Sequence, residues 1–102
     1  VLDSRFAGTK LEEYTSRTIP TGDALIKVLH EVRKQGYAID DGEYTLGVFC
    51  VAVPIRDGAG SVVAAMSCSV PKARIELGEL ETKQMIEVLT RQASSISEAL
   101  SA

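Results

Sequence analysis

The chain contains no tryptophan, one histidine and two cysteines among its 102 residues. A nucleophilic cysteine or serine needs a base or a cationic neighbour, and His30 is the only imidazole that could serve. His30 lies off the apolar stripe of a predicted helix, which favours a solvated surface histidine. The sequence also has no zinc-type spacing of Cys and His, no P-loop and no nucleophile-elbow motif. We therefore expect no enzyme activity, no metal and no other cofactor.

Long apolar runs and an excess of basic charge are also missing. No stretch of about 18 apolar residues occurs, which argues against a membrane span. The net charge of −3 and the pI near 5.1 give no electrostatic footprint for nucleic acid. Two cysteines without a framework spacing favour a reduced, cytoplasmic setting. The chain opens at Val1 without an initiator methionine, so we expect a piece of a longer protein.

Apolar periodicity predicts helices at both sides of a central hairpin. Thr21 is expected to cap a first helix, with Asp23 in its first turn and Gly36 at its end. An apolar stripe from about Leu77 to Leu100 predicts a long closing helix. Residues 1–20 have the composition of a connection with a short strand near 15–19.

Two valine-rich segments, residues 42–56 and 61–70, predict β-strands joined by a tight turn. Helix, hairpin and helix together indicate an α+β arrangement with an antiparallel sheet. Pro54 predicts a sheet edge or a bulge, because proline cannot donate to a strand ladder.

A turn of even length in RDGAGS fixes the pairing of the hairpin. It places Cys50 opposite Ser67 and Val48 opposite Ser69. Because side chains alternate along a strand, Cys50, Ser67 and Ser69 then project from one face. The other face is continuously apolar and suited to covering helices. A loop of odd length would shift this register.

Hydroxyls and a thiol on one buried face need hydrogen-bond partners. An unpartnered buried hydroxyl costs about 1–3 kcal/mol, and a small polar ligand would supply what the strand ladder does not. Two alternatives stay open. Cys50 can be a small hydrophobe of the strand, and Asp40 and Glu43 can belong to a turn whose side chains bond local backbone donors.

The segment EVRKQGYAIDDGEYTLGVFCVAVPIRDGAGSVVAAMSCSVPKAR resembles the C-terminal effector-binding domain of IclR-type bacterial transcriptional regulators. The match runs with the same spacing from Thr18 to Arg74, and the long closing helix also fits. The resemblance implies a GAF-like fold, in which helices cover one face of an antiparallel sheet and the effector pocket lies on the other. It further implies that Asp40, Cys50, Ser67 and Ser69 line the effector site.

Two positions depart from the family pattern. Gly42 replaces a glutamate, which is expected to loosen the turn after Asp41. Val70 replaces a glycine, which is expected to narrow the pocket wall beside Ser69. The first half of the effector domain and the winged helix-turn-helix before it have no counterpart in residues 1–102, which we interpret as the C-terminal part of the domain.

The resemblance implies a sensing function for the chain. Its parent would bind a small organic acid, form a homo-oligomer and contact DNA only through its N-terminal domain, without membrane contact. Cys50, Ser67 and Ser69 would bond the ligand oxygens, and Asp40 would meet a ligand hydroxyl or backbone donors. No positive side chain is expected in the pocket.

The alternative is an oligomerisation module of the same fold without an active ligand pocket. An enzyme built on Cys50 would need a depressed thiol pKa. Nothing in the sequence chooses the effector.

Overall fold

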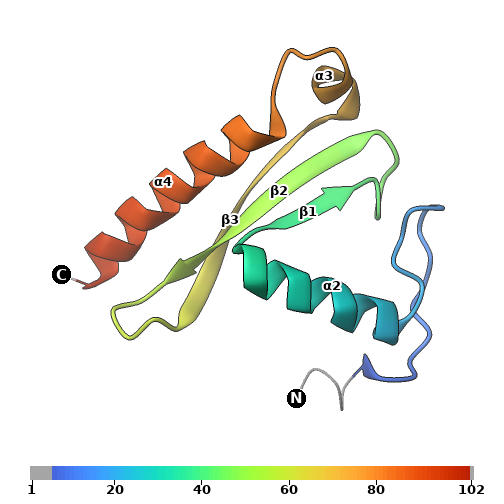
Figure 1. The fold of residues 1–102 in the computed structure, drawn as a ribbon, viewed down its shortest axis with the longest axis horizontal. Coiled ribbons are helices and arrows are strands. Elements are labelled where there is room, and N and C mark those ends of the chain that lie inside the picture. Colours follow the sequence, from blue (N-terminus) through green and yellow to red (C-terminus); the bar gives the residue numbers. More distant parts are fainter. Residues whose placement is uncertain (1–5, 102) are drawn as a thin grey trace.

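A computed structural model describes residues 6–101 as one antiparallel sheet with helices beside it (Figure 1). The elements are, in chain order, α2 (Gly22–Gln35), β1 (Ala38–Asp41), β2 (Val48–Arg56), β3 (Val62–Pro71), α3 (Lys72–Glu76) and α4 (Thr82–Ser101). The strands lie in the order β1-β2-β3. Figure 1 shows α4 running along the β2–β3 hairpin, and α2 beyond β1. The predicted α+β class and the antiparallel hairpin are confirmed.

Helix α2 has the capping residues that the sequence predicts. The Ala24 N–H donates to the Thr21 side chain over 3.1 Å, which satisfies one of the free donors of the first turn. At the other end Gly36 adopts φ 86°, and its N–H donates to the Val32 carbonyl. This left-handed residue ends the helix and turns the chain into β1.

The core lies between α4 and one face of the sheet. Its buried residues are Phe49, Val51, Val53 and Ile55 from β2 and Met85, Leu89 and Ala93 from α4. Burying a side chain of this size contributes about 1.5–3 kcal/mol. The predicted stripe on the closing helix is therefore correct at Leu89 and Ala93. It does not extend to Leu100, which is 53% exposed.

Several predicted boundaries are wrong, and glycines explain most of them. β2 begins at Val48 rather than at residue 42, because Gly42 and Gly47 both have positive φ and interrupt the extended chain. Helix α4 begins at Thr82 rather than near Leu77, because Gly78 has φ 75°. Strand β1 was not predicted, since its four residues look like an acidic turn. Residues 15–19 form no strand.

The hairpin loop has three residues instead of an even number. The Asp57 N–H donates to the Ser61 carbonyl over 2.9 Å, and the Gly60 N–H donates to the Asp57 carbonyl over 3.0 Å. Gly60 has φ 83°, the left-handed conformation that closes a three-residue hairpin loop. The loop therefore shifts the pairing by one residue from the predicted register.

A bulge between Ile55 and Arg56 shifts the pairing by one more residue. Cys50 consequently pairs with Ser69 rather than with Ser67, and Ala52 pairs with Ser67. The predicted pairs are wrong by two residues. Because an even shift leaves side-chain alternation unchanged, residues 64–71 keep their predicted faces. Val62 lies before the bulge and pairs with Arg56, so it faces the same side as Cys50 rather than the core, where it was predicted.

The sheet edge expected at Pro54 is present. β1 begins at Ala38, opposite Ala52, so within residues 6–101 no strand lies on that side of Pro54. The Arg56 N–H instead donates to the Ser97 side chain of α4 over 3.2 Å. The bulge lies one residue beyond Pro54. A proline and a helix hydroxyl thus protect this short open edge.

Candidate functional site

The four residues predicted to bind a ligand lie on the sheet face opposite the core. Two adjacent rows cross the three strands: Asp40–Cys50–Ser69 and Ala38–Ala52–Ser67. Residues directly opposite one another in an antiparallel pair have Cβ atoms about 4.5–5.5 Å apart. The sheet therefore gathers an acid, a thiol and two hydroxyls into one group, called here the polar patch (Asp40, Cys50, Ser67 and Ser69).

The patch is more open than the sequence indicated. Asp40 and Cys50 are half-buried, whereas Ser67 and Ser69 are exposed. The expectation of buried hydroxyls is wrong for both serines, because no element among residues 6–101 covers this part of β3 closely enough to exclude solvent. The two hydroxyls are accessible to solvent and to a ligand, so neither carries the cost of a buried hydroxyl that lacks a partner.

Asp40 already has one local partner. Its Oδ1 accepts a hydrogen bond from the Glu43 N–H over 2.9 Å. This is the backbone bond that the sequence left open as the alternative to ligand binding. Among the described residues no donor bonds Oδ2. One carboxylate oxygen of Asp40 thus holds the turn, and the other can accept from a ligand.

The neighbouring Asp41 points to the other face and has a structural role. It forms ion pairs with Arg17 over 3.0 Å and with Lys72 over 2.8 Å. The Lys72 ammonium also lies 4.9 Å from the centroid of the Phe49 ring. The hydrogen bond from Lys72 lowers the pKa of Asp41, opposed by partial burial and assisted by both positive charges. This network joins β1 to α3 and to the segment before α2.

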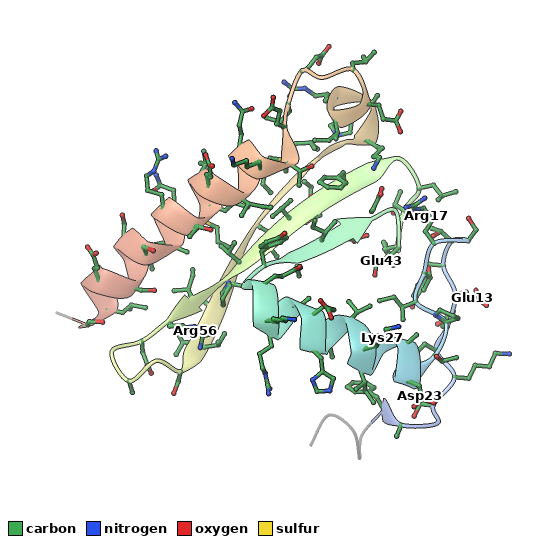
Figure 2. The ribbon with its side chains drawn as sticks, viewed as in Figure 1. Glu13, Arg17, Asp23, Lys27, Glu43 and Arg56 are labelled. Atoms are coloured by element: carbon green, nitrogen blue, oxygen red, sulfur yellow. The ribbon has the colours of Figure 1, made fainter. Side chains whose placement is uncertain are left out.

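Several hydrogen bonds hold the turn after Asp41. The expectation that Gly42 loosens this turn is therefore wrong. Gly42 is buried with φ 78°, and its N–H donates to the Val48 carbonyl over 3.0 Å. The Thr15 hydroxyl donates to the Gly42 carbonyl over 2.5 Å, and the Thr18 hydroxyl donates to the Glu43 carbonyl. Figure 2 shows Arg17 and Glu43 together at this end of the sheet. These contacts hold the turn that positions Asp40.

Burial, with a smaller contribution from the Asp40 charge, raises the pKa of Glu43. Glu43 does not belong to the polar patch, since its backbone rather than its side chain bonds Asp40.

Val70 does not narrow the patch. It pairs with Phe49, packs against the buried core and is half-buried on the α4 side of the sheet. The expectation that it reshapes the wall beside Ser69 is wrong, because successive side chains of β3 point to opposite faces.

A groove of about 370 Å³ lies between α2 and the same face of the sheet. Ala38 and Ala52 of the second row line it, together with Arg33 of α2 and Arg56 of β2. None of the four patch residues lines it. No positive side chain was expected in the ligand pocket, and these two arginines lie beside it on the same face of the sheet. Strand alternation alone could have placed Arg56 on the face of Cys50, but the position of Arg33 depends on how α2 docks.

Residues 6–101 contain no cluster of three or more His, Cys, Asp or Glu side chains that could hold a metal ion. The helices in this part of the chain are also too short or too polar to cross a membrane.

Comparison with known proteins identifies the family of this fold. The family model for the bacterial transcriptional regulator IclR C-terminal domain matches residues 1–98. The chain belongs to this family. The KdgR transcriptional regulator of Escherichia coli is 38% identical over 90 residues, which make up 88% of this chain and 34% of KdgR. The chain thus spans about a third of the length of that relative, which is named as a transcriptional regulator.

Solved structures confirm the IclR C-terminal fold. The crystal structure of the C-terminal domain of Escherichia coli KdgR superposes with a TM-score of 0.83 at 34% identity, covering 99% of this chain and 60% of that one. The inducer-binding domain of PobR from Acinetobacter, a double mutant in complex with 3-hydroxybenzoic acid, has a TM-score of 0.76 at 24% identity, covering 88% and 51%. The PobR likeness shows the fold alone.

Replacing Asp41 by asparagine should lower the free energy of unfolding by about 1 kcal/mol at pH 7, the upper range for partly exposed ion pairs. Because the folded-state pKa of Asp41 is lowered, this stabilisation is present above the unfolded pKa and is lost as the pH falls through the folded pKa. Urea denaturation from pH 7 to pH 3 should therefore show the two proteins converging in acid.

The control is Glu79→Gln, which removes an exposed ion pair with Arg74. This change should alter the unfolding free energy by less than about 0.5 kcal/mol. A difference between Asp41→Asn and the parent that persists unchanged to pH 3 would contradict the assignment to the Asp41 charge.

Proposed function

We propose that this chain is the C-terminal part of the small-molecule sensing domain of a bacterial transcriptional regulator, and that the polar patch binds a small organic acid. The parent is a cytoplasmic homo-oligomer that contacts DNA through a separate N-terminal domain. Binding of the acid changes how the oligomer holds its operator. The observation that carries the proposal is the register, which brings Asp40, Cys50, Ser67 and Ser69 together on the face opposite the core.

The chemistry of the patch suits an oxygen-rich ligand. The two serine hydroxyls donate to carboxylate or carbonyl oxygens, and the Cys50 thiol is a weak donor beside them. Asp40 repels a carboxylate, since two like charges disfavour each other at close range. Its Oδ2 therefore accepts from a hydroxyl of the ligand, and the acid group lies away from Asp40.

The alanines beside the patch leave room for the body of the ligand. Ala38 and Ala52 occupy the row of Ser67, and neither fills the face with a large side chain. The PobR domain, which has the same fold, holds 3-hydroxybenzoic acid. That complex supports the proposal that a fold of this kind accommodates a hydroxylated acid.

A matched pair of neighbours tests the proposal, after a thermal-shift screen of organic acids on the complete sensing domain. Ser67→Ala should weaken binding of the selected acid by about 0.5–1.5 kcal/mol, the net contribution of one hydrogen bond. Its unfolding free energy should change little, because the hydroxyl is exposed. Cys68→Ala should instead lower stability by about 1 kcal/mol and leave affinity intact, because Cys68 faces the core.

Isothermal titration and urea denaturation separate the two variants. Loss of binding in Cys68→Ala with unchanged binding in Ser67→Ala would place the site on the other face and refute the proposal.

An oligomerisation module without a ligand site is the second candidate function. Helix α4 exposes Val88 and Leu100, at 51% and 53%, on a helix that otherwise packs on the sheet. Exposed apolar side chains on one helix suit contact with a second copy. Sedimentation that shows concentration-dependent association, together with no thermal shift from any acid, would favour this candidate.

A further inference from the structure

The groove between α2 and the sheet combines an apolar lining with positive charge. Leu29 and Val32 line it from the helix, Ala52 and Ala65 from the strands, and Arg33 and Arg56 carry its charges. No aspartate or glutamate is among the described residues that line it. The chain as a whole has a net charge of −3. The groove is therefore a locally positive, apolar surface on a negatively charged chain.

Both guanidinium groups are available to an anion. Within residues 6–101 no carboxylate forms an ion pair with Arg33. Arg56 donates from Nη1 to the Gly60 carbonyl over 2.8 Å, so the hairpin loop fixes its position. No carboxylate in the described part of the chain forms an ion pair with it. Figure 2 shows Arg56 near the hairpin end of β2, on the side of α2.

The favourable effect of a positive charge at the end of a helix does not by itself explain why residue 33 is an arginine. A basic residue in the last turn of a helix is favourable by about 0.3–1 kcal/mol, and Lys34 is in the same turn. Only Arg33 of the two lines the groove. An arginine can bind a carboxylate through two parallel hydrogen bonds, which a lysine cannot.

We infer that the groove binds an organic monocarboxylate with an apolar, ring-sized body, whose carboxylate is held by Arg33 with Arg56 as a second cation. The inference rests on the proposed function and names the chemical class of its ligand. The body of the ligand lies on Ala52, which pairs with Ser67, so the groove and the polar patch are continuous. A volume of about 370 Å³ is within the range of small-molecule sites.

Three probes separate charge from apolar contact. Benzoate carries both features, benzamide keeps the ring without the charge, and acetate keeps the charge without the ring. Nuclear magnetic resonance titration of the complete sensing domain should give benzoate the highest affinity of the three. Arg33→Gln should weaken benzoate binding about tenfold, through loss of the charge-assisted bonds. Arg33→Lys should restore part of that loss.

Lys34→Gln is the matched control, since it removes the same charge from the same turn but not from the groove. It should change benzoate affinity by less than twofold. Equal effects of Arg33→Gln and Lys34→Gln, or equal binding of benzoate and benzamide, would overturn the inference.

Ser67→Ala and Arg33→Gln together separate binding in the groove from binding at the polar patch. If Ser67→Ala weakens benzoate binding while Arg33→Gln does not, the groove assignment is refuted and the polar patch remains. If Arg33→Gln weakens binding while Ser67→Ala does not, the groove assignment is supported and the role of the patch is refuted.

Discussion

Leu89→Ala is expected to lower the free energy of unfolding by about 2–5 kcal/mol, the range for truncating a buried leucine. Leu89 is 7% exposed and belongs to the core between α4 and β2. Its removal deletes apolar contacts and leaves a cavity beside strand residues such as Val51, which is 0% exposed. A small domain has a total stability of about 5–15 kcal/mol. The variant is therefore expected to be near the limit of folding, as measured by urea denaturation.

Leu100→Ala is the control on the same helix. Leu100 is 53% exposed, so its truncation should cost less than about 1 kcal/mol. Similar losses in the two variants would contradict the position of the core on the Leu89 side of α4.

Gly42→Glu is expected to have the second largest effect, a loss of about 1–2 kcal/mol from the left-handed backbone of a non-glycine residue, with a further loss from crowding. Gly42 has φ 78°, and a side chain there would meet the Arg17 Cδ at 3.2 Å. The substitution restores the residue of the family pattern. It should loosen the turn whose Glu43 N–H bonds Asp40, and so reduce ligand affinity as well as stability.

Gly47→Glu separates strain from crowding. Gly47 has φ 82°, but a side chain there would have no neighbour within 4 Å. Urea denaturation should therefore show a smaller loss for Gly47→Glu than for Gly42→Glu. The opposite order would mean that the contacts around Gly42 do not hold the turn.

The composition of the polar patch could be predicted because it depends on alternation more than on exact pairing. The sequence places Cys50, Ser67 and Ser69 on one face, and the structure keeps them there although the register differs by two residues. A three-residue loop and a bulge each shift the pairing by one, and their effects on the face cancel.

The rest of the site depends on tertiary contacts that local patterns do not encode. Asp40 was expected in a turn, yet it lies on β1 beside Cys50. Four residues of mixed polarity give too weak a period-two signal for a strand. The groove is similarly absent from the pattern, because Arg33 lines it only through the placement of α2 against the sheet. Exposure of the serines could not be predicted, since it depends on which segments cover β3.

The central claim, that the polar patch binds an organic acid, is tested most directly by ligand protection of the two cysteines. Both are free and half-buried, with Cys50 in the patch and Cys68 on the core face. Mass spectrometry can follow their alkylation by iodoacetamide with and without the acid selected by thermal shift. The account predicts that the saturating acid slows alkylation of Cys50 and leaves the rate at Cys68 unchanged. An unchanged rate at Cys50, or protection of Cys68 alone, would contradict it.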